Sequence, residues 1–322
     1  MFKVGIIGCG GISRHHHKYF TATGRAEVDF VYDILPDVAR EKAITWKARV
    51  AASAEELIDN VDVVVVATPG FAHREYVEAA AAAGKHVYCE KPIALNLEDA
   101  LAMREAVEKA AVTFEVNFTQ RNKPTFAQLR RIEQEGRIGN VVSAWAALHA
   151  PASSERWRKI QADGHWRASM QLSGGRINEF CSHTINWLLW VLGKPKSIYG
   201  KALYVTEGFE LDDADYALID CETGPGLLDV HRHAGIAADS RYGILGHAGS
   251  VVLKNDRVYL TLMDKDPVEI DTDPDVPSRQ EAFLHAIEAG NTSLEGIDNA
   301  IDTLKVCLAF NRSAKSGQVE TV

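Results

Sequence analysis

Long apolar segments are missing from this sequence. The longest candidate, VDVVVVA at 61–67, is far shorter than the roughly 18 to 20 residues that span a bilayer, and it suits a buried strand. The first residues, MFKVGIIG, lack the length and the cleavage region of a signal peptide. We therefore expect a protein of the cytoplasm that has no membrane partner.

Paired cysteines and an excess of positive charge are absent too. The five cysteines, at positions 9, 89, 181, 221 and 307, lie far apart with no CxxC spacing, which fits reduced thiols better than disulfides or a zinc site. Lysine and arginine number 35 against 44 aspartate and glutamate residues, so the formal net charge is −9. A net negative surface argues against nucleic acid as the main partner.

The sequence does contain a regular alternation of strands and helices. Its 322 residues, 46% of them hydrophobic, are enough for two domains with buried cores. Up to residue 120, strands rich in valine and isoleucine alternate with helices, which predicts an α/β domain with a doubly wound parallel sheet, the Rossmann arrangement. The predicted domains are 1–120 and 121–322. We expect the second to be α+β, with a largely antiparallel open sheet and a helix over 176–192.

The turn after the first strand predicts a dinucleotide site. Gly8, Gly10 and Ser13 form a G-x-G-x-x-S pattern after a strand and before a helix. The first glycine permits a tight turn, and the second lets the backbone approach a pyrophosphate that the helix N-terminus stabilises. We assign the whole turn, with Gly11 and Ile12, to cofactor binding.

An acidic residue ends the next strand and selects the cofactor. Asp33 follows Gly8 by 25 residues. A carboxylate there suits the ribose hydroxyls of NAD and repels the extra phosphate of NADP. The next residue, Ile34, offers that phosphate no cation. The pattern therefore favours NAD over NADP.

Three consecutive histidines, His15, His16 and His17, raise the question of a metal. Consecutive residues of a helix point in different directions, so these three do not converge on one ion. We expect one of them to line the nucleotide turn and the others to be solvated. No metal site is predicted.

A longer signature follows at 67–92. It contains Ala67-Thr68-Pro69, then His73, then Gly-Lys-His-Val at 84–87 and Glu-Lys-Pro at 90–92. This pattern resembles the Gfo/Idh/MocA oxidoreductase family, named for glucose–fructose oxidoreductase and inositol dehydrogenase. Later segments resemble the same family in the same order: NFTQRNKPTFAQL, RIGNV, GILGHAGSV and the C-terminal CLAFNRSAKSGQVETV.

The resemblance implies a set of residues around the nicotinamide nucleotide. In addition to the glycine turn and Asp33, the implied cofactor contacts are Ala67, Thr68, Pro69, His73, Glu90, Lys91 and Asn117. Lys91 is also implied to be catalytic, as a donor to the reacting oxygen. The resemblance further implies a cis bond before Pro92 that directs Lys91 into the cleft.

One apolar helix carries polar residues at regular spacing. In GGRINEFCSHTINWLLWVLG (174–193), Glu179, His183 and Asn186 fall at i, i+4 and i+7, on one face of a helix. Such a face must meet partners or water, so it faces either solvent or a wet cleft. The family usually reads Gly-Gly-Gly-x-x-x-Asp-x-x-x-His-x-x-Asp here, which favours the cleft. This sequence keeps the histidine and replaces the two aspartates.

By resemblance, His183 is the acid/base, because an ordinary imidazole pKa of about 6.5 suits proton exchange near neutrality. Glu179 orients His183 or binds a substrate hydroxyl. The predicted substrate-binding residues are Arg121, Trp166, Arg167, Glu179, His183 and Asn186. Trp157 and His165 lie in the same polar and aromatic loop as Trp166, and such residues can contact a sugar or fix the loop by packing.

The sequence thus predicts an NAD(P)-dependent dehydrogenase, with NAD as the cofactor, that acts on a secondary hydroxyl or ketone of a sugar, polyol or sugar acid. Two alternatives stay open: a redox-neutral NAD-dependent enzyme that cleaves a glycosidic bond, and a non-catalytic regulator that binds a dinucleotide. The retained Lys91 and His183 argue against a dead site. Because the open sheet needs a cover, which the family usually supplies by pairing subunits, we expect a homodimer or homotetramer.

Overall fold

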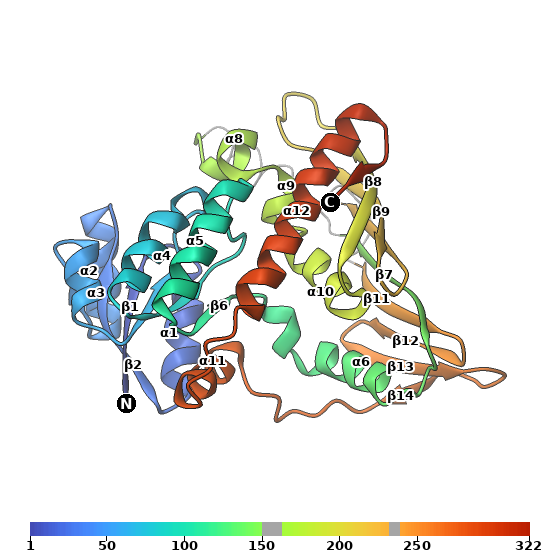
Figure 1. The fold of residues 1–322 in the computed structure, drawn as a ribbon, viewed down its shortest axis with the longest axis horizontal. Helices are drawn as coiled ribbons and strands as arrows, with labels where there is room; N and C mark the ends of the chain where they lie inside the picture. Colours follow the sequence, from blue (N-terminus) through green and yellow to red (C-terminus); the bar gives the residue numbers. More distant parts are fainter. Residues whose placement is uncertain (150–162, 232–238) are drawn as a thin grey trace. The chain divides into compact units, whose positions relative to one another are not determined.

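The computed structural model describes residues 1–149, 163–231 and 239–322 (Figure 1). The chain divides into two compact units, and the second begins at Thr119, close to the predicted boundary at 120. Unit 1 comprises Met1–Phe118 and Pro277–Ile301, and unit 2 comprises Thr119–Val276 and Asp302–Val322.

Unit 1 is built on a parallel sheet in the order β3-β2-β1-β4-β5-β6, which confirms the predicted doubly wound arrangement. Its middle strands are buried on both faces, as the near-continuous valine run of β4 requires. The strands are β1 (Phe2–Ile7), β2 (Ala26–Tyr32), β3 (Arg49–Val50), β4 (Val63–Val66), β5 (His86–Cys89) and β6 (Phe114–Val116).

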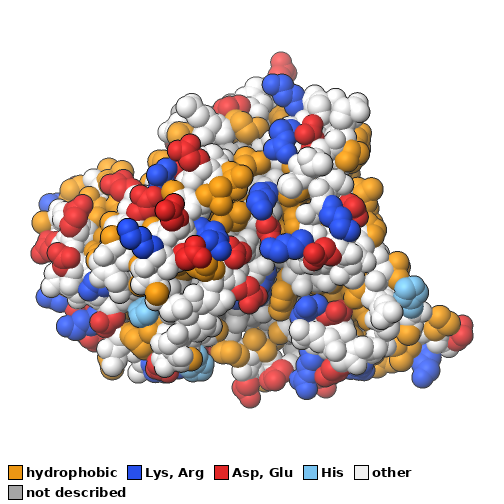
Figure 2. Space-filling view, viewed as in Figure 1, with side chains coloured by type: hydrophobic (Ala, Val, Ile, Leu, Met, Phe, Trp, Pro, Cys, Tyr) orange, Lys and Arg blue, Asp and Glu red, His pale blue; other side chains and the backbone are white. Residues whose placement is uncertain are grey.

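Helices flank this sheet, and local signals in the sequence explain where several begin. They are α1 (Ser13–Ala22), α2 (Pro36–Trp46), α3 (Ala54–Asp59), the short η1 (Gly70–Ala72), α4 (His73–Ala82), α5 (Leu97–Ala110) and α11 (Arg279–Glu288). The Ser53 side chain accepts a hydrogen bond from the Glu56 amide at the start of α3, and Asn96 does the same for Asp99 at the start of α5. Figure 2 shows acidic and basic side chains mixed over α4 and α5.

Residues 277–301 belong to unit 1, whereas the predicted second domain ran to residue 322. The reason is the packing of α11 against the first unit. Phe283 contacts the buried ring of Tyr88 edge to face at 5.2 Å, and Arg279 forms an ion pair of 2.5 Å with Glu115. These contacts join positions far apart in the sequence, so no local pattern predicts them.

Unit 2 contains a mixed sheet in the order β14-β13-β12-β11-β7-β10-β9-β8-β15. Every pairing is antiparallel except that of β10 with β7, so the predicted, largely antiparallel sheet is confirmed. The strands are β7 (Val141–His149), β8 (Pro195–Leu203), β9 (Ala214–Cys221), β10 (Pro225–His231), β11 (Asp239–Gly246), β12 (Gly249–Lys254), β13 (Arg257–Leu262), β14 (Val268–Ile270) and β15 (Glu320–Thr321).

Helices cover one face of this sheet (Figure 1). Buried and exposed residues therefore alternate along its strands. Leu228 and Val230 of β10 are buried beneath these helices, while Leu227 in the same strand points to the other face and is exposed. The core beneath the helices centres on residues such as Trp187 and Phe310. The helical segments are η2 (Thr119–Asn122), α6 (Pro124–Gln134), η3 (Trp166–Ala168), α8 (Met170–Ser173), α9 (Arg176–Glu179), α10 (Ser182–Leu192) and α12 (Glu295–Ser316).

The predicted single helix over 176–192 is wrong. The segment forms α9 and α10, separated by Phe180 and Cys181, whose backbone angles (φ, ψ) are −111°, −35° and −90°, −9°. Glu179 therefore ends one helix, and His183 lies in the first turn of the next. The regular i, i+4 relation between them does not hold.

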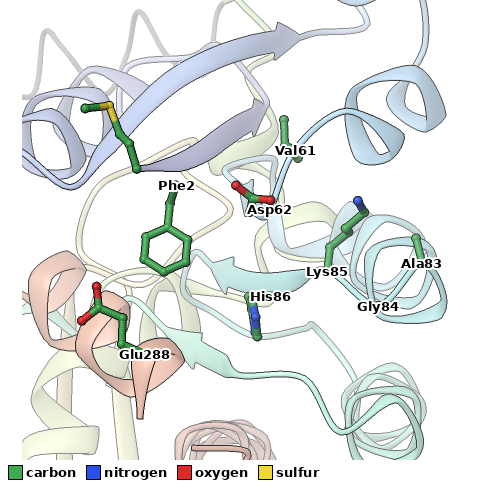
Figure 3. Close-up of a pocket in the computed structure, with 9 residues that line it drawn as sticks. Phe2, Val61, Asp62, Ala83, Gly84, Lys85, His86 and Glu288 are labelled. Atoms are coloured by element: carbon green, nitrogen blue, oxygen red, sulfur yellow. The ribbon is translucent and has the colours of Figure 1, made fainter. Parts of the chain in front are cut away.

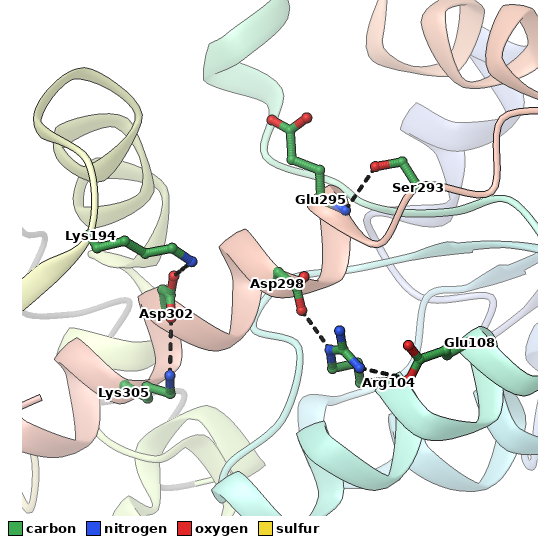
Figure 4. Close-up of polar contacts among 8 residues, drawn as sticks. All are labelled: Arg104, Glu108, Lys194, Ser293, Glu295, Asp298, Asp302 and Lys305. Atoms are coloured by element: carbon green, nitrogen blue, oxygen red, sulfur yellow. Dashed lines mark hydrogen bonds and ion pairs between the residues drawn. The ribbon is translucent and has the colours of Figure 1, made fainter.

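Helix α12 begins in unit 1 and continues in unit 2, with the division between Ile301 and Asp302. Figure 4 shows its polar contacts within each unit. Asp298 accepts a hydrogen bond from Arg104 of α5 at 2.7 Å. Asp302 accepts one from Lys194 at 2.6 Å and one from Lys305 at 3.1 Å. Among the described residues, no helix is both long enough and apolar enough to cross a membrane.

Candidate active site

The glycine turn has the geometry that its sequence predicts. Gly8 follows β1 with φ of +93°, a conformation that side chains disfavour. A Cβ at this position would lie 2.8 Å from the backbone oxygen of Ala67 and 2.9 Å from the amide nitrogen of Thr68. Gly8 thus lets the ends of β1 and β4 approach each other, at the point where the strand order reverses. In open α/β sheets this is where ligands bind.

The other two glycines leave space that the described protein does not fill. A Cβ at Gly10 or Gly11 would meet no atom within 4 Å in the described part of the chain. Ser13 is buried, and its hydroxyl donates to the Gly10 carbonyl at 2.6 Å, which fixes the turn. Helix α1 starts here with no side-chain cap and no acidic residue in its first turn. Its N-terminus is therefore suited to a pyrophosphate, and the residues present fit a dinucleotide.

Asp33 lies at the carboxyl end of β2, where the prediction required it. Its two carboxylate oxygens accept hydrogen bonds from the backbone amides of Cys9 at 2.7 Å and Leu35 at 2.9 Å. Each oxygen can accept a second bond, so the carboxylate can still receive ribose hydroxyls. The bond from Cys9 holds Asp33 against the glycine turn, and the bond from Leu35 is local.

The Ala67-Thr68-Pro69 segment continues from β4 at the same edge of the sheet. The Thr68 hydroxyl oxygen is buried and has no hydrogen-bond partner among the described residues, so it is free to bind a ligand. His73 is completely buried. Its ring nitrogens lie 2.9 Å from the Thr68 carbonyl oxygen and 3.1 Å from that of Ile93. The imidazole thus braces the Thr68 turn from inside the protein.

A buried polar network supports the Glu-Lys-Pro segment after β5. The carboxylate of Glu90 accepts from His16 Nε2 at 2.9 Å and from the Asn117 amide at 2.6 Å. Asn117 in turn accepts from the buried Tyr88 hydroxyl at 2.7 Å. Glu90 and Asn117, predicted as cofactor contacts, therefore direct their side chains to other protein groups. Lys91 follows directly, and the Lys91–Pro92 peptide bond is cis, as the resemblance implies.

The charge of Glu90 follows from these contacts. Burial by itself raises the pKa of this carboxyl. The hydrogen bond and charge of His16, the charge of Lys91 and the Asn117 amide outweigh burial and lower the pKa to about 2. Sequence reasoning missed the role of His16. The sequence shows only that a histidine occurs in the first turns of α1, because Glu90, the partner of His16, is 74 residues away.

A cavity of about 530 Å³ in unit 1 lies away from these residues (Figure 3). Its lining includes Phe2 and His86, the first residues of β1 and β5, together with Asp62, Lys85 and Glu288. The cavity therefore lies at the amino ends of the strands. Because the glycine turn, Asp33 and Lys91 all follow carboxyl ends, this cavity is not the predicted cofactor site.

In unit 2, helix α10 keeps one accessible stripe. His183 and Trp190, seven residues apart, are partly exposed, and the other residues of α10 are buried. On a helix, positions i and i+7 share a face. The predicted acid/base thus lies on the accessible stripe of an otherwise buried helix. Asn186, predicted on the same stripe, is buried at 1% exposure.

Asn186 instead binds two protein groups. Its amide oxygen accepts from Arg121 Nε at 2.9 Å, and its amide nitrogen donates to the Thr303 hydroxyl at 3.1 Å. The Arg121 guanidinium lies 5.3 Å from the ring centre of Trp190. Asn186 therefore positions Arg121 beside the accessible stripe.

Glu179 has a clear partner as well. Arg167 Nε donates to the Glu179 carboxylate at 2.8 Å, and the Arg167 guanidinium lies 4.4 Å from the ring centre of Trp166. The Glu179 side chain is 3% exposed and that of Arg167 is 40% exposed. The structure thus brings Trp166, Arg167 and Glu179 together. His165 stacks on Trp166, and Trp157 lies outside the described residues.

The fold and the glycine turn define a dinucleotide-binding protein of the Rossmann class. Residues 2–118 match the model of an oxidoreductase family with an NAD-binding Rossmann fold, GFO_IDH_MocA, and residues 126–252 match the model of the GFO/IDH/MocA C-terminal domain. This protein belongs to the Gfo/Idh/MocA oxidoreductase family. The predicted family and the NAD cofactor are confirmed.

Named relatives add detail about the family. Glucose-6-phosphate 3-dehydrogenase of Bacillus subtilis is 32% identical over 194 residues, which cover 60% of this chain and 54% of that protein. The chain thus matches about half the length of this relative. Inositol 2-dehydrogenase of Rhizobium meliloti is 27% identical over 262 residues, covering 79% and 76% of the two chains.

A solved structure of levoglucosan dehydrogenase in complex with NADH shares the fold. It superimposes with a TM-score of 0.90 at 21% identity, over 100% of this chain and 99% of that one.

Proposed function

We propose that this protein is an NAD-dependent dehydrogenase that interconverts a secondary hydroxyl and a ketone on a sugar, polyol or sugar acid. The observation that carries the proposal is the accessible His183 on the otherwise buried helix α10. On a helix whose other positions are buried, this partly exposed imidazole can meet a ligand and exchange a proton with it. The names of the two relatives above, both dehydrogenases of polyhydroxylated compounds, agree with this reaction class.

Each proposed residue has a distinct role. The residues of the glycine turn and Asp33 would hold NAD, which would supply the hydride acceptor for the carbinol carbon. His183 accepts the hydroxyl proton, and Lys91 donates a hydrogen bond to the same oxygen. Glu179, held by Arg167, binds a substrate hydroxyl, and Arg121 and Trp166 supply further substrate contacts. The cofactor residues are those of the glycine turn, Asp33 and the Ala67-Thr68-Pro69 segment, with Glu90, Asn117 and His73 supporting them from within.

The choice of NAD over NADP follows from Asp33. Its carboxylate is fixed by two backbone amides, so it cannot turn away from an extra phosphate without losing both bonds. Like charges at close range are strongly unfavourable in a partly buried site.

We also propose that unit 2 pairs with a second copy, giving a homodimer or homotetramer. The sheet face opposite the helices exposes Tyr199, Leu218, Leu227 and Leu245, each between 45% and 48% exposed. A contiguous apolar sheet face favours association. Light scattering after gel filtration should report an oligomer, and Leu218→Glu should dissociate it. Leu101→Glu, at an equally exposed leucine on α5 of unit 1, is the control.

The compartment that we propose is the cytoplasm. All five cysteines are free and buried, with no disulfide among them. Reduced thiols are the ordinary state in that compartment.

The first experiment mixes the purified full chain with NAD and a panel of inositols, aldoses, sugar acids and deoxy sugars, with NADP in parallel, and follows NADH absorbance. We expect NADH with one substrate class. His183→Ala and Lys91→Ala should each lower turnover about 100-fold or more while NAD still binds. His247→Ala, in an exposed turn of unit 2, is the control and should keep wild-type turnover.

Unchanged turnover in either catalytic variant would overturn the assignment. No NADH from any substrate, with NAD bound tightly, would instead favour the redox-neutral enzyme or the regulator.

A further inference from the structure

Three metal-binding side chains meet on the helix-free face of the sheet in unit 2. His149 ends β7, and Asp229 and His231 lie two residues apart on β10. The two strands are parallel neighbours, and His149 pairs in register with His231. Because Leu228 and Val230 are buried under the helices, Asp229 and His231 must project to the opposite face.

The ligand atoms of these residues are already close. Asp229 Oδ2 lies 3.0 Å from His149 Nε2, and Asp229 Oδ1 lies 2.8 Å from His231 Nε2. All three ligand atoms lie within 4.8 Å of one another. A tetrahedral zinc ion about 2.0 to 2.1 Å from its ligands holds them about 3.3 Å apart, so modest side-chain rotations suffice.

One carboxylate oxygen in this group lacks a proper hydrogen bond. Asp229 Oδ1 is buried and accepts no hydrogen bond of acceptable geometry from any described residue, although His231 Nε2 is only 2.8 Å away. The Tyr216 hydroxyl is also 2.8 Å from that same nitrogen. A hydroxyl and a carboxylate thus compete for one ring nitrogen. A cation between Asp229 and the two imidazoles would coordinate Asp229 Oδ1, the oxygen that accepts no hydrogen bond.

We propose that His149, Asp229 and His231 form a binding site for a divalent first-row transition-metal ion, with Zn²⁺ as the best-matched ion. Two imidazole nitrogens and one carboxylate oxygen are ligands of that class, whereas Ca²⁺ and Mg²⁺ prefer oxygen alone. The three side chains are between 26% and 41% exposed, which leaves room for water at the remaining position.

Neighbouring charges suit a dication. Asp239, which pairs in register with His149 on β11, adds a second carboxylate to the surroundings, and its charge is shared with Arg241 through an ion pair of 2.6 Å. The site therefore contains two imidazoles and the Asp229 carboxylate, and the charge of the nearby Asp239 is balanced by Arg241. No described lysine or arginine forms an ion pair with Asp229.

This site is separate from the proposed hydride chemistry. Helix α10, which carries His183, packs on the other face of β7 and β10, so the sheet lies between them. The ion would join two neighbouring strands at their carboxyl ends. Its presence can therefore be tested without any turnover. The sequence did not predict it, because His149 and Asp229 are 80 residues apart.

Calorimetric titration of the chelator-treated full chain with Zn²⁺ tests the proposal, and Co²⁺ absorbance reports the ligand set. We expect one site in the wild type with nitrogen and oxygen ligands. Asp229→Asn and His231→Gln should each weaken Zn²⁺ binding about tenfold or more. Zn²⁺ should raise the melting temperature of the wild type and not of these variants. His247→Gln, which removes an exposed histidine elsewhere in unit 2, is the control.

The sheet face that carries these side chains is also the proposed subunit contact, so the melting temperature and the oligomeric state of each variant are compared with those of the wild type without metal, and we expect both to be unchanged. Wild-type Zn²⁺ affinity in both Asp229→Asn and His231→Gln would overturn the proposal, as would a wild type that takes up no Zn²⁺. Failure of the dehydrogenase assay leaves this result untouched, because the titration contains neither NAD nor substrate.

Discussion

His16 donates a hydrogen bond from Nε2 to the carboxylate of Glu90, across 2.9 Å, with the imidazole completely buried. The direction of the bond follows from the low pKa of Glu90, since an ionised carboxylate can only accept. The pair ties α1, whose N-terminus forms part of the glycine turn, to the residue before Lys91. One contact thus links the cofactor turn and a proposed catalytic group within unit 1.

Removing the imidazole should destabilise the protein strongly. His16→Ala leaves a buried carboxylate without its main partner, and breaking such a pair costs about 3 kcal/mol or more. Urea unfolding should show this loss of free energy. His15→Ala, at the partly exposed neighbour, is the control and should change stability by less than about 0.5 kcal/mol. Equal stability of the two variants would contradict the role given to His16.

The contribution of Glu90 should depend on pH in a defined direction. Its folded pKa of about 2 is below the ordinary value of 4.5, so ionised Glu90 stabilises the fold above pH 4.5. This contribution is lost as pH falls from 4.5 towards 2. Glu90→Gln should therefore be less stable than the wild type at neutral pH, and the difference should shrink over that acid range. A difference that is constant with pH would argue against an ionised Glu90.

The two glycines of the turn should respond differently to alanine. Gly8→Ala places a Cβ 2.8 Å from the backbone of Ala67 at a φ of +93°, so we expect a marked fall in melting temperature. Gly10→Ala meets no described atom within 4 Å and should melt like the wild type. It should nevertheless weaken NAD binding, because its methyl group occupies space that the pyrophosphate needs. Tight NAD binding by Gly10→Ala would place the pyrophosphate elsewhere.

Asp33 should control the choice between NAD and NADP. Asp33→Ala removes the acceptor for the ribose hydroxyls, and adding Ile34→Arg supplies a cation for the extra phosphate. Fluorescence titration with NADH and NADPH should show NADH binding weakened about tenfold and the preference shifted towards NADPH. Asp37→Ala, at an acidic residue in the first turn of α2, is the matched control. An unchanged preference in the double variant would show that Asp33 does not contact the ribose.

Local sequence patterns predicted much of the fold. The valine run of β4 and the glycine turn after β1 predict strands and a nucleotide turn because both depend on neighbouring residues. The break between α9 and α10 was not predicted, because the apolar residues continue through Phe180 and Cys181 without a glycine or proline. The placement of α11 in unit 1 depends on Phe283 and Tyr88, which are distant in sequence.

The candidate site shows the same limit. Glu90, Asn117 and Asn186 are predicted ligand contacts, and the structure adds that their side chains bind His16, Tyr88 and Arg121 within the protein. A motif states which residue occurs and not what it touches. Burial and partners depend on tertiary packing, which one sequence does not reveal.

The burial of every thiol gives this protein its own probes of local opening. Burial raises the pKa of Cys9 and of Cys221 to about 12, and it raises the pKa of Cys89, Cys181 and Cys307 as well. A thiolate-directed label therefore reacts only when the surrounding structure opens. Cys9 and Cys89 lie in unit 1, and the other three lie in unit 2. Labelling rates, read by mass at each cysteine, would show which unit opens first, without any introduced reporter.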